Sequence, residues 1–432
     1  MGNKVALYYR GIGILILAGG LLLVAKMAKE GSPKTEVISE TEPVTSQESA
    51  WAPGKPQERP ATPVMHVPAA TRPHSPAIQG NQPPTSTAPP AIARPEPDAF
   101  TRQLVADLAQ PAAEGAHVTS DQVERWKQNL QKLVGQGAGA IPAISEFLSR
   151  NVDYDFGTAG KESLGFASAR SAMIQALVDI GGADALSAMS EVLGNTAVPR
   201  DIALVAQGMD KLAPGQNVDA TLAAAREALA MAHDGKLTSQ DVAPLFEVIT
   251  RYGGPGALEE LQGSSGNWSY YSVMALASLP EGAGVDALAR MAAGSPGSAP
   301  ETRQAALEML AQSAPNSPAA QSALLDMVRN NQIPPGQWGV IEPLLAGEQI
   351  RFRDSVYGVP MEDARASEMR STHMSAGNQN LYMALPNGGL SPEQASQYSR
   401  LIDDLLAATT DALGREALQR SKLKLASRLP PP

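Results

Sequence analysis

The sequence predicts an all-α fold of stacked helix pairs, preceded by a single transmembrane helix and a disordered proline-rich linker. Aromatic residues make up 4% of the 432 residues, and a chain rich in alanine and leucine favours thin helix packing over an aromatic-rich sandwich or barrel. The first hundred residues hold an apolar run and a proline-rich stretch, and similar helical segments recur further along the chain. We therefore expect five parts, at residues 1–30, 31–97, 98–345, 346–390 and 391–432.

Residues 5–28 are expected to cross a membrane. An uninterrupted run of apolar residues and glycine, Gly11 to Ala25, lies between Arg10 and Lys26. A helix of this run spans only ~22 Å, which is short of the hydrocarbon core. The two flanking basic side chains can reach the interfaces, and two neighbouring tyrosines suit the interfacial belt. The run with its flanks is therefore long enough for a membrane anchor.

A cleaved signal peptide is the alternative for this segment, because a basic stretch precedes an apolar run of the right length. A cut after Ala28 would leave Lys26 close to the cleavage site, where small residues are required, so we favour an uncleaved signal anchor. Basic residues are almost evenly divided between the two ends of the run, so the positive-inside rule alone leaves the orientation open.

Residues 31–97 contain 15 prolines among threonine, serine, alanine and glutamine. Such a segment cannot bury enough apolar surface to offset its ordering entropy, and we expect an extended linker of roughly 45 to 200 Å. A set of PxxP ligands for SH3 or WW domains is the alternative. An anchor followed by such a linker resembles the layout of bacterial inner-membrane proteins that hold a domain in the periplasm. The resemblance implies a single-pass protein of the inner membrane with its C-terminal domain in the periplasm.

From Asp98 onward the chain reads as amphipathic helices separated by glycine and proline turns, with no convincing strand. Several segments share an apolar helix end, a turn of small residues, and then alanine and leucine at helical spacing. These segments lie at 133–151, 177–195, 211–230, 248–267, 276–295 and 310–328. Equivalent positions from Leu177 to Leu310 are separated by 31 to 36 residues. This period predicts helix pairs that bury their apolar faces against their neighbours.

The recurring units resemble HEAT repeats, notably in ALVDIGGADALSAM and GAGAIPAISEFL. The resemblance covers about Ser120 to Asn331 and implies an α-solenoid over residues 98–345. The unit at 199–235 departs from the pattern. Residues 346–390 interrupt it, and we expect an irregular insert there, which is either a partner-binding loop, an ordered strap packed on the terminal repeat, or a disordered segment. Residues 391–432 are expected to form two capping helices, the first with Ser391 as its N-cap and Pro392 at its first position.

The segment NVDYDFGTAGKE, residues 151–162, is expected to be an insertion between two helices. Its spacing matches a calcium loop, because hard oxygen ligands recur at alternate positions and a carboxylate closes the series. The candidate metal residues are Asn151, Asp153, Asp155, Gly157 and Glu162. Phe156 stands where the sharp turn of such a loop requires glycine. A solvated acidic spacer and a partner-contact loop therefore remain as alternatives.

Composition argues against several classes of function. Residues 98–432 hold 25 Lys and Arg against 37 Asp and Glu, and an acidic domain without a basic stripe argues against nucleic-acid binding. The chain has no cysteine, so thiol catalysis and cysteine-ligated metals are excluded. The hydrolase signatures G-x-S-x-G and H-E-x-x-H are absent as well. We expect no enzyme, and no cofactor apart from the calcium alternative.

The sequence favours a membrane-anchored, non-catalytic interaction scaffold or adaptor that presents a helical-repeat surface to protein partners. Two alternatives stay open: an enzyme or enzyme accessory on a HEAT-like scaffold, as in the bilin lyases, and a structural protein of the cell envelope. Interfaces favour aromatic residues, methionine and arginine. The candidate partner-binding residues are Trp268, Tyr270, Tyr271, Arg351, Arg353, Met361, Met369 and Met374. A role in the core is the alternative for the three aromatic residues.

Overall fold

A computed structural model describes most of the chain from residue 96 onward. The described residues are 96–110, 118–237, 240–294, 299–353, 355–357, 368–374, 377–386 and 389–428, with only the backbone given at 158–159, 368–374 and 377–379. They belong to one compact unit, Ala88–Pro432. No helix in the described part is both long and apolar enough to cross a membrane. The predicted span at 5–28 and the linker up to residue 95 lie outside the described residues.

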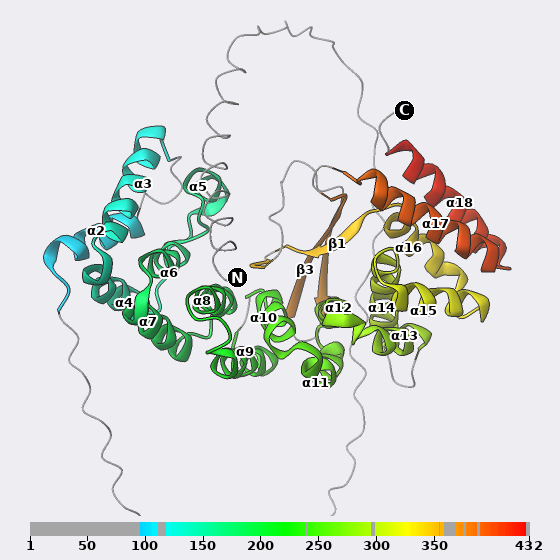
Figure 1. The fold of residues 1–432 in the computed structure, drawn as a ribbon, viewed down its shortest axis with the longest axis horizontal. Helices are drawn as coiled ribbons and strands as arrows, with labels where there is room; N and C mark the ends of the chain where they lie inside the picture. The colour runs from blue at the N-terminus through cyan, green and yellow to red at the C-terminus, as the bar shows by residue number, and fades with distance from the viewer. Residues whose placement is uncertain are drawn as a thin grey trace, which may run out of the picture. The chain divides into compact units, whose positions relative to one another are not determined.

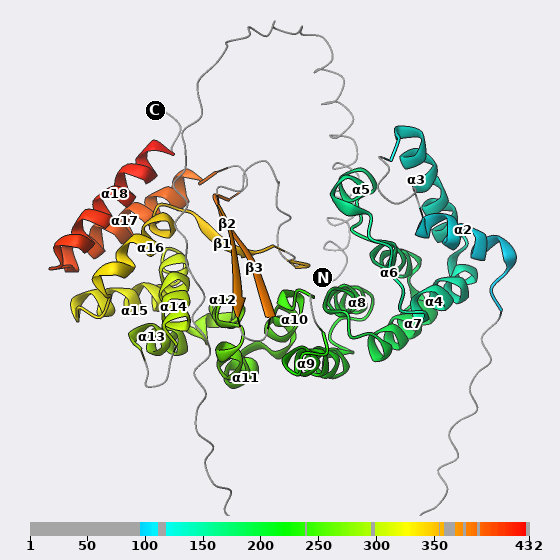
Figure 2. The same cartoon turned by 180° about the vertical axis from the view of Figure 1, so that it is seen from behind.

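This unit is mainly helical, and its helices form two rows (Figures 1 and 2). The inner row contains α3 (Ser120–Gly135), α6 (Ala169–Ile180), α8 (Pro199–Leu212), α10 (Ala243–Gly253), α12 (Ser269–Ala277), α14 (Pro300–Ser313), α16 (Trp338–Leu345) and α18 (Ala412–Ser427). The outer row contains α2 (Ala99–Ala109), α4 (Ile141–Ser149), α7 (Gly182–Asn195), α9 (Val218–His233), α11 (Leu258–Gly263), α13 (Val285–Ala293), α15 (Pro318–Arg329) and α17 (Pro392–Ala408). Each inner helix packs on the next one along the row, and α5 (Gly157–Leu164) packs beside α3.

Each recurring segment of the sequence forms a junction between two neighbouring helices, as the pattern predicts. Helix α6 ends at Ile180 and α7 begins at Gly182, with positive φ angles of 69° at Gly181 and 82° at Gly182. Only glycine adopts such angles without strain, so the glycine pair fixes the reversal. Short 3-10 helices occupy several of the other turns. They are η1 (Gly137–Ala140), η2 (Gly254–Ala257), η3 (Ser264–Gly266), η4 (Pro280–Gly282) and η5 (Pro335–Gln337). The prediction of packed helix pairs is confirmed.

Small residues let neighbouring helices approach closely in this core. A Cβ atom at Gly208 of α8 would lie 2.5 Å from the Cγ2 atom of Val178 on α6 and 3.1 Å from the Sδ atom of Met189 on α7. A buried ion pair also joins α6 to α8, with the Nε atom of Arg170 at 2.6 Å from the Oδ2 atom of Asp201. Aliphatic packing and one internal charge pair therefore hold these three helices together.

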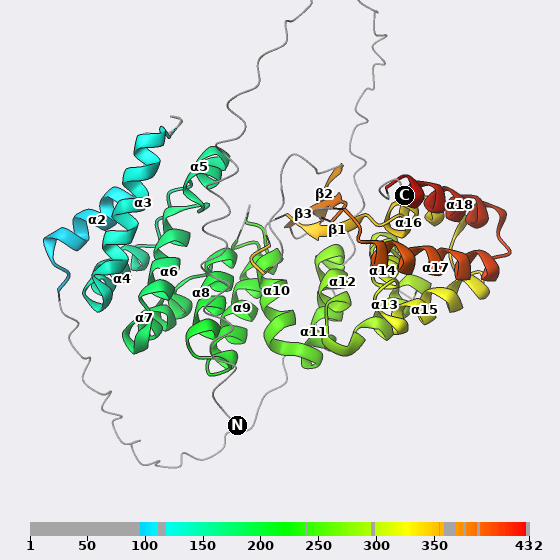
Figure 3. The same cartoon turned by 45° about the horizontal axis from the view of Figure 1, so that its top comes forward.

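The expectation of an all-α fold with an irregular insert is wrong in one respect, because part of the insert forms an antiparallel sheet. Its strands are β1 (Gln349–Phe352), β2 (Glu368–Met374) and β3 (Gly377–Ala384), in the order β1-β3-β2. In the register, Ile350 pairs with Met383 and Met374 pairs with Gly377. Figure 3 shows the sheet beside the inner row, above α12. The chain therefore folds back from α16 onto helices far earlier in the sequence.

The two expected C-terminal helices are present as α17 and α18. The side chain of Ser391 accepts a hydrogen bond from the backbone N–H of Gln394, whose side chain accepts one from the N–H of Ser391, and Pro392 begins the helix as predicted. Helix α18 packs on α16, where the indole N–H of Trp338 donates to the Oδ2 atom of Asp411 at 2.7 Å. The C-terminal pair thus extends the row of helices.

We predict that replacing Gly414 with alanine destabilises the contact between α16 and α18. A Cβ atom at this position would lie 2.5 Å from the Cε2 atom of Trp338, whose ring is buried. Overpacking of this kind costs about 1–3 kcal/mol, which exceeds the gain of up to ~1 kcal/mol in helix propensity. Urea unfolding of the full-length protein, followed by far-ultraviolet circular dichroism, measures the change in the free energy of unfolding.

The matched control is Gly339→Ala on α16, because no atom lies within 4 Å of a Cβ built there. We expect this variant to be at least as stable as the parent protein. An unchanged or increased stability of Gly414→Ala would show that α18 does not rest on Trp338.

We predict that the docking of α18 depends on pH through Glu342. Burial acts to raise the pKa of this carboxyl, but hydrogen bonds from Lys424 and Arg420 outweigh it and hold the pKa below its usual range. Their nitrogen atoms lie 2.7 and 2.8 Å from its oxygens. A lowered pKa in the folded state gives stability that is present above about pH 4.5 and is lost as the pH falls through the folded value.

The measurement is the loss of unfolding free energy between about pH 7 and about pH 3. Glu342→Gln should show a smaller loss than the parent protein, because the amide does not titrate. The same change at the exposed Glu227 of α9 should leave the loss as it is in the parent. An equal loss in the Glu342 variant and the parent would contradict the assignment.

Candidate functional site

Side-chain hydrogen bonds attach the insert to the inner row. They occupy backbone groups of β1 that a further strand would otherwise pair with. The amide of Gln312, on α14, donates to the carbonyl oxygen of Ile350 at 3.1 Å and accepts from its N–H at 2.6 Å. These two backbone groups point away from β3, since β1 is an edge strand. A side-chain amide therefore satisfies the edge of β1 and fixes its distance from α14.

Tyr271 of α12 provides the second attachment. Its hydroxyl donates to the Oδ1 atom of Asp241 at 2.7 Å and accepts from the backbone N–H of Asn380 in β3 at 2.5 Å. The Tyr271 ring meets the ring of Phe352 edge to face, with 5.4 Å between centroids. Tyr271 is fully buried. Through the ring contact and the hydrogen bond, this one side chain connects α12 to both β1 and β3.

The segment after β1 continues along the inner row toward α8. The carboxylate of Glu247 on α10 accepts from the Ser355 hydroxyl and from the N–H of Val356, the latter at 2.8 Å. The hydroxyl of Tyr357 donates to the carbonyl oxygen of Ala203 on α8 at 3.1 Å and lies 3.4 Å from the Tyr252 hydroxyl. Burial raises the pKa of Tyr357 far above its usual range, with the Tyr252 hydroxyl as a further cause. The phenol therefore stays protonated and keeps its role as donor.

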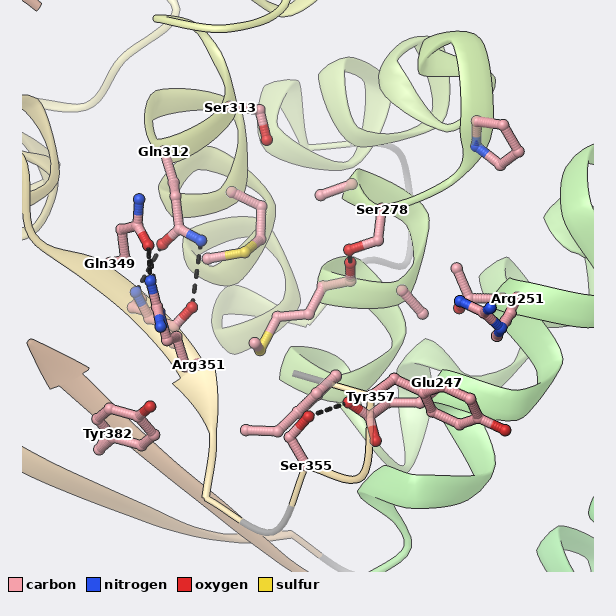
Figure 4. A pocket seen from close by; sticks show the side chains of 18 residues that line it. Glu247, Arg251, Ser278, Gln312, Ser313, Gln349, Arg351, Ser355, Tyr357 and Tyr382 are labelled. Carbon is pink, nitrogen blue, oxygen red and sulfur yellow. Dashed lines mark hydrogen bonds between the residues drawn. The ribbon is translucent and has the colours of Figure 1, made fainter. Parts of the chain in front are cut away.

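These attachments border an open cavity of about 580 Å³ between the inner row and the insert. Helices α10, α12 and α14 form one wall, and β1 with the segment 355–357 forms the other (Figure 4). Apolar side chains in the lining are Met274, Met309, Ile350, Phe352 and Tyr382. Polar lining residues include Ser278, Ser313, Gln312 and Gln349. The volume lies within the range of small-molecule and short-peptide sites.

Two guanidinium groups border this cavity. The Nε and Nη2 atoms of Arg351 donate to the Oε1 atom of Gln349, at 3.2 and 2.6 Å. Arg251 stacks on the ring of Tyr357, with 5.1 Å from its Cζ atom to the ring centroid, and its Nη2 atom lies 3.8 Å from a carboxylate oxygen of Asp210. Figure 4 places the two arginines at opposite sides of the cavity in that view.

The candidate partner residues fall into two groups. Trp268, Tyr270 and Tyr271 are buried in the core of α12 and its neighbours, which is the alternative reading of these residues. The Trp268 ring packs against Phe246 with 6.0 Å between centroids. These aromatic residues therefore present no exposed face to a partner.

The other candidates lie in or near the insert. Arg351 lines the cavity, and Arg353 follows β1 with an exposed side chain. Met369 and Met374 belong to β2, and Met361 lies outside the described residues. Of the predicted partner residues, Arg351 is thus the candidate that the structure brings to the cavity together with Gln349 and Gln312.

The predicted loop at 151–162 is shorter than expected, because α5 begins at Gly157 and contains Glu162. Asp153 uses its Oδ1 atom to accept from the N–H groups of Tyr154 and Arg170, both at 2.9 Å. Asp155 accepts from the N–H of Gly157 at 2.8 Å. Asn151 adopts a φ of 51°, and its side-chain amide lies 3.4 Å from the carbonyl oxygen of Asn195. Among the described residues, no three His, Asp or Glu side chains are grouped to hold a metal ion.

Phe156 explains much of this arrangement. Its ring packs edge to face on Trp126 of α3, with 5.9 Å between centroids, and the indole N–H of Trp126 donates to the carbonyl oxygen of Leu108 at 3.0 Å. The segment thus joins α3 and α6, while Val152 and Tyr154 remain 47% and 37% exposed. The exposed pair keeps the partner-contact reading of this segment open.

The cavity contains several residues that sequence reasoning missed, among them Glu247, Gln312, Met274, Met309 and Tyr357. Glu247 and Tyr357 are separated by more than a hundred positions in the sequence, and periodicity reports only on neighbours along one helix or strand. Of the insert residues that the sequence singled out, Arg351 lies in the cavity lining.

No family model matches this sequence. The search of curated proteins finds no relative of the chain either.

We predict that Tyr357→Phe loosens the insert. The change removes the hydrogen bond to the carbonyl oxygen of Ala203 and lowers the free energy of unfolding by about 1 kcal/mol. Amide hydrogen exchange of Val356 should become faster, because Val356 is next to Tyr357 in the released segment. Its hydrogen bond to Glu247 should then open more often. Urea unfolding and exchange followed by mass spectrometry measure the two effects.

Tyr154→Phe is the control, since that tyrosine is exposed on the segment between α4 and α5. It should change neither quantity. Exchange at Val356 that is the same in Tyr357→Phe as in the parent would show that Tyr357 does not hold the insert.

Proposed function

We propose that this protein is a membrane-anchored, non-catalytic interaction scaffold or adaptor that binds a protein partner in the cavity between its inner row and its insert. The observation that carries the proposal is the cavity of about 580 Å³ with methionine, aromatic and arginine residues in its lining. These residue types are enriched at protein interfaces, and methionine adapts its shape to varied ligands. The site is thus suited to the insertion of a short segment of a partner.

The helical architecture supports the same proposal. Two rows of packed helix pairs are compatible with a HEAT-like α-solenoid, and such a fold offers a long curved surface to its partners. The proposed anchor at 5–28 and the linker at 31–97 rest on the sequence alone. A linker of this composition would let the helical unit search a volume around its anchor, with the periplasm as its proposed compartment.

The groups around the cavity favour binding over catalysis. Glu247 contributes a carboxylate to the lining, and this carboxylate holds Ser355 and Val356 of the insert in place. Tyr357 stays protonated and bonds to the backbone of α8. Both groups therefore have structural tasks that explain their presence in the cavity wall.

Site-specific crosslinking tests this function. A photoreactive amino acid at Ser278, which is exposed and lines the cavity, should crosslink one protein partner in intact cells at a defined mass. The same amino acid at Ser322, exposed on the outer-row helix α15, should not capture that partner. The reason is that the proposed partner enters the cavity and leaves the outer row free.

Purified complexes would be identified by mass spectrometry, and the partner would be expressed and shown to bind the full-length protein in lipid nanodiscs. Capture of the same set of proteins at Ser278 and Ser322 would refute the proposed site. A failure to capture any protein at either position would refute it as well. A covalent product from a small-molecule substrate in the cavity would instead support the enzyme alternative.

A further inference from the structure

The cavity lining brings together two cationic side chains of an acidic domain. Residues 98–432 carry 25 Lys and Arg against 37 Asp and Glu, whereas the cavity lining contains Arg251 and Arg351 against the one carboxylate of Glu247. Two donors of the insert, the Ser355 hydroxyl and the Val356 N–H, engage that carboxylate. Arg251 pairs with the carboxylate of Asp210 at 3.8 Å, so Arg351 is the cation of the lining that can attract an anionic group.

Arg351 is oriented by a neutral group. Its guanidinium donates twice to the amide oxygen of Gln349 and forms no ion pair with any residue in the described part of the chain. An amide partner restrains the side chain but leaves its full positive charge in place. The planar guanidinium has five N–H donors, so further donors remain for a bidentate bond to a carboxylate.

The rest of the lining defines the other half of the ligand. Met274, Met309 and Phe352 line the same cavity as Arg351 and supply apolar surface. The free energy falls when apolar side chains leave water for such a surface. The cavity therefore suits a molecule with an apolar body and one anionic end.

The edge of β1 limits the way in which this ligand can bind. The N–H and carbonyl groups of Ile350 are both occupied by the amide of Gln312, so a peptide cannot pair with them as an added strand. The guanidinium of Arg351 and the apolar wall are then the groups that can recognise the ligand.

We propose, on the basis of the proposed function, that the cavity recognises the carboxyl terminus of a partner protein that ends in apolar residues. The terminal carboxylate binds the guanidinium of Arg351, and the last apolar side chains lie against Met274 and Met309. This assignment names the chemistry of the partner segment and goes beyond the general scaffold role.

The test compares two peptides that differ only at the C-terminus. Dansyl-Leu-Leu-Leu with a free carboxylate and the same peptide as its amide are titrated against the full-length protein in lipid nanodiscs, and fluorescence anisotropy reports binding. The free carboxylate should bind about tenfold more tightly, as expected for one charge-assisted hydrogen-bonded pair. Arg351→Gln should abolish this preference while leaving the affinity for the amide unchanged.

Arg329→Gln is the matched control, because it removes the same charge from an exposed position on α15, outside the cavity. It should keep the tenfold preference. Far-ultraviolet circular dichroism of both variants checks that the helices are intact. Equal binding of the two peptides, binding of neither, or a preference that survives Arg351→Gln would overturn the proposal.

The crosslinking experiment separates this inference from the proposed function. A partner captured at Ser278 whose affinity does not depend on a free carboxyl terminus would overturn the inference and leave the scaffold function standing. Selective peptide binding that requires Arg351, with no protein captured at Ser278, would support the carboxylate site and refute the scaffold function.

Discussion

The pair of hydrogen bonds between the Gln312 amide and the backbone of Ile350 determines where the insert lies. An edge strand exposes backbone donors and acceptors, and buried groups of this kind cost free energy when they stay unpaired. Gln312 satisfies one such position from a helix, so β1 can lie against α14 without a fourth strand. The position of β1 then sets that of β3 through the register, and β3 receives the hydroxyl of Tyr271 at Asn380. The cavity exists because these contacts hold the insert at the inner row while leaving space between them.

The insert also links four consecutive helices of the inner row. Its attachments begin at α14, continue to α12 and α10, and end with Tyr357 on the backbone of α8. A row of helix pairs held only by contacts between neighbours can change its curvature through small changes at each junction. A segment fixed to four inner helices opposes such changes. The wall that binds the proposed ligand is therefore the same structure that stiffens the row.

The helices could be predicted from the sequence because their signals are local. The glycine pair after Ile180 and the cap at Ser391 each specify one helix end within a few residues. The sheet could not be predicted, since residues 381–384 of β3 are all buried and show no alternation of apolar and polar positions. A short run that is buried on both faces does not distinguish a strand from a helix. Its pairing with β1, 29 to 35 residues earlier, leaves no trace in periodicity.

The segment after α4 shows why ligand spacing alone is a weak guide to a metal site. Asp153 and Asp155 occur at positions that suit calcium, yet the same short carboxylates are the side chains best able to accept backbone N–H groups at turns and helix starts. In this chain they serve the backbone of Arg170 and Gly157. Phe156, which disfavours a calcium loop, packs its ring on Trp126 and so fixes the segment to α3. Arg351 of the insert is a separate case, because the structure places this predicted partner residue in the cavity lining. Gln349 orients Arg351 without neutralising it, and the charge that remains is what an incoming carboxylate can use.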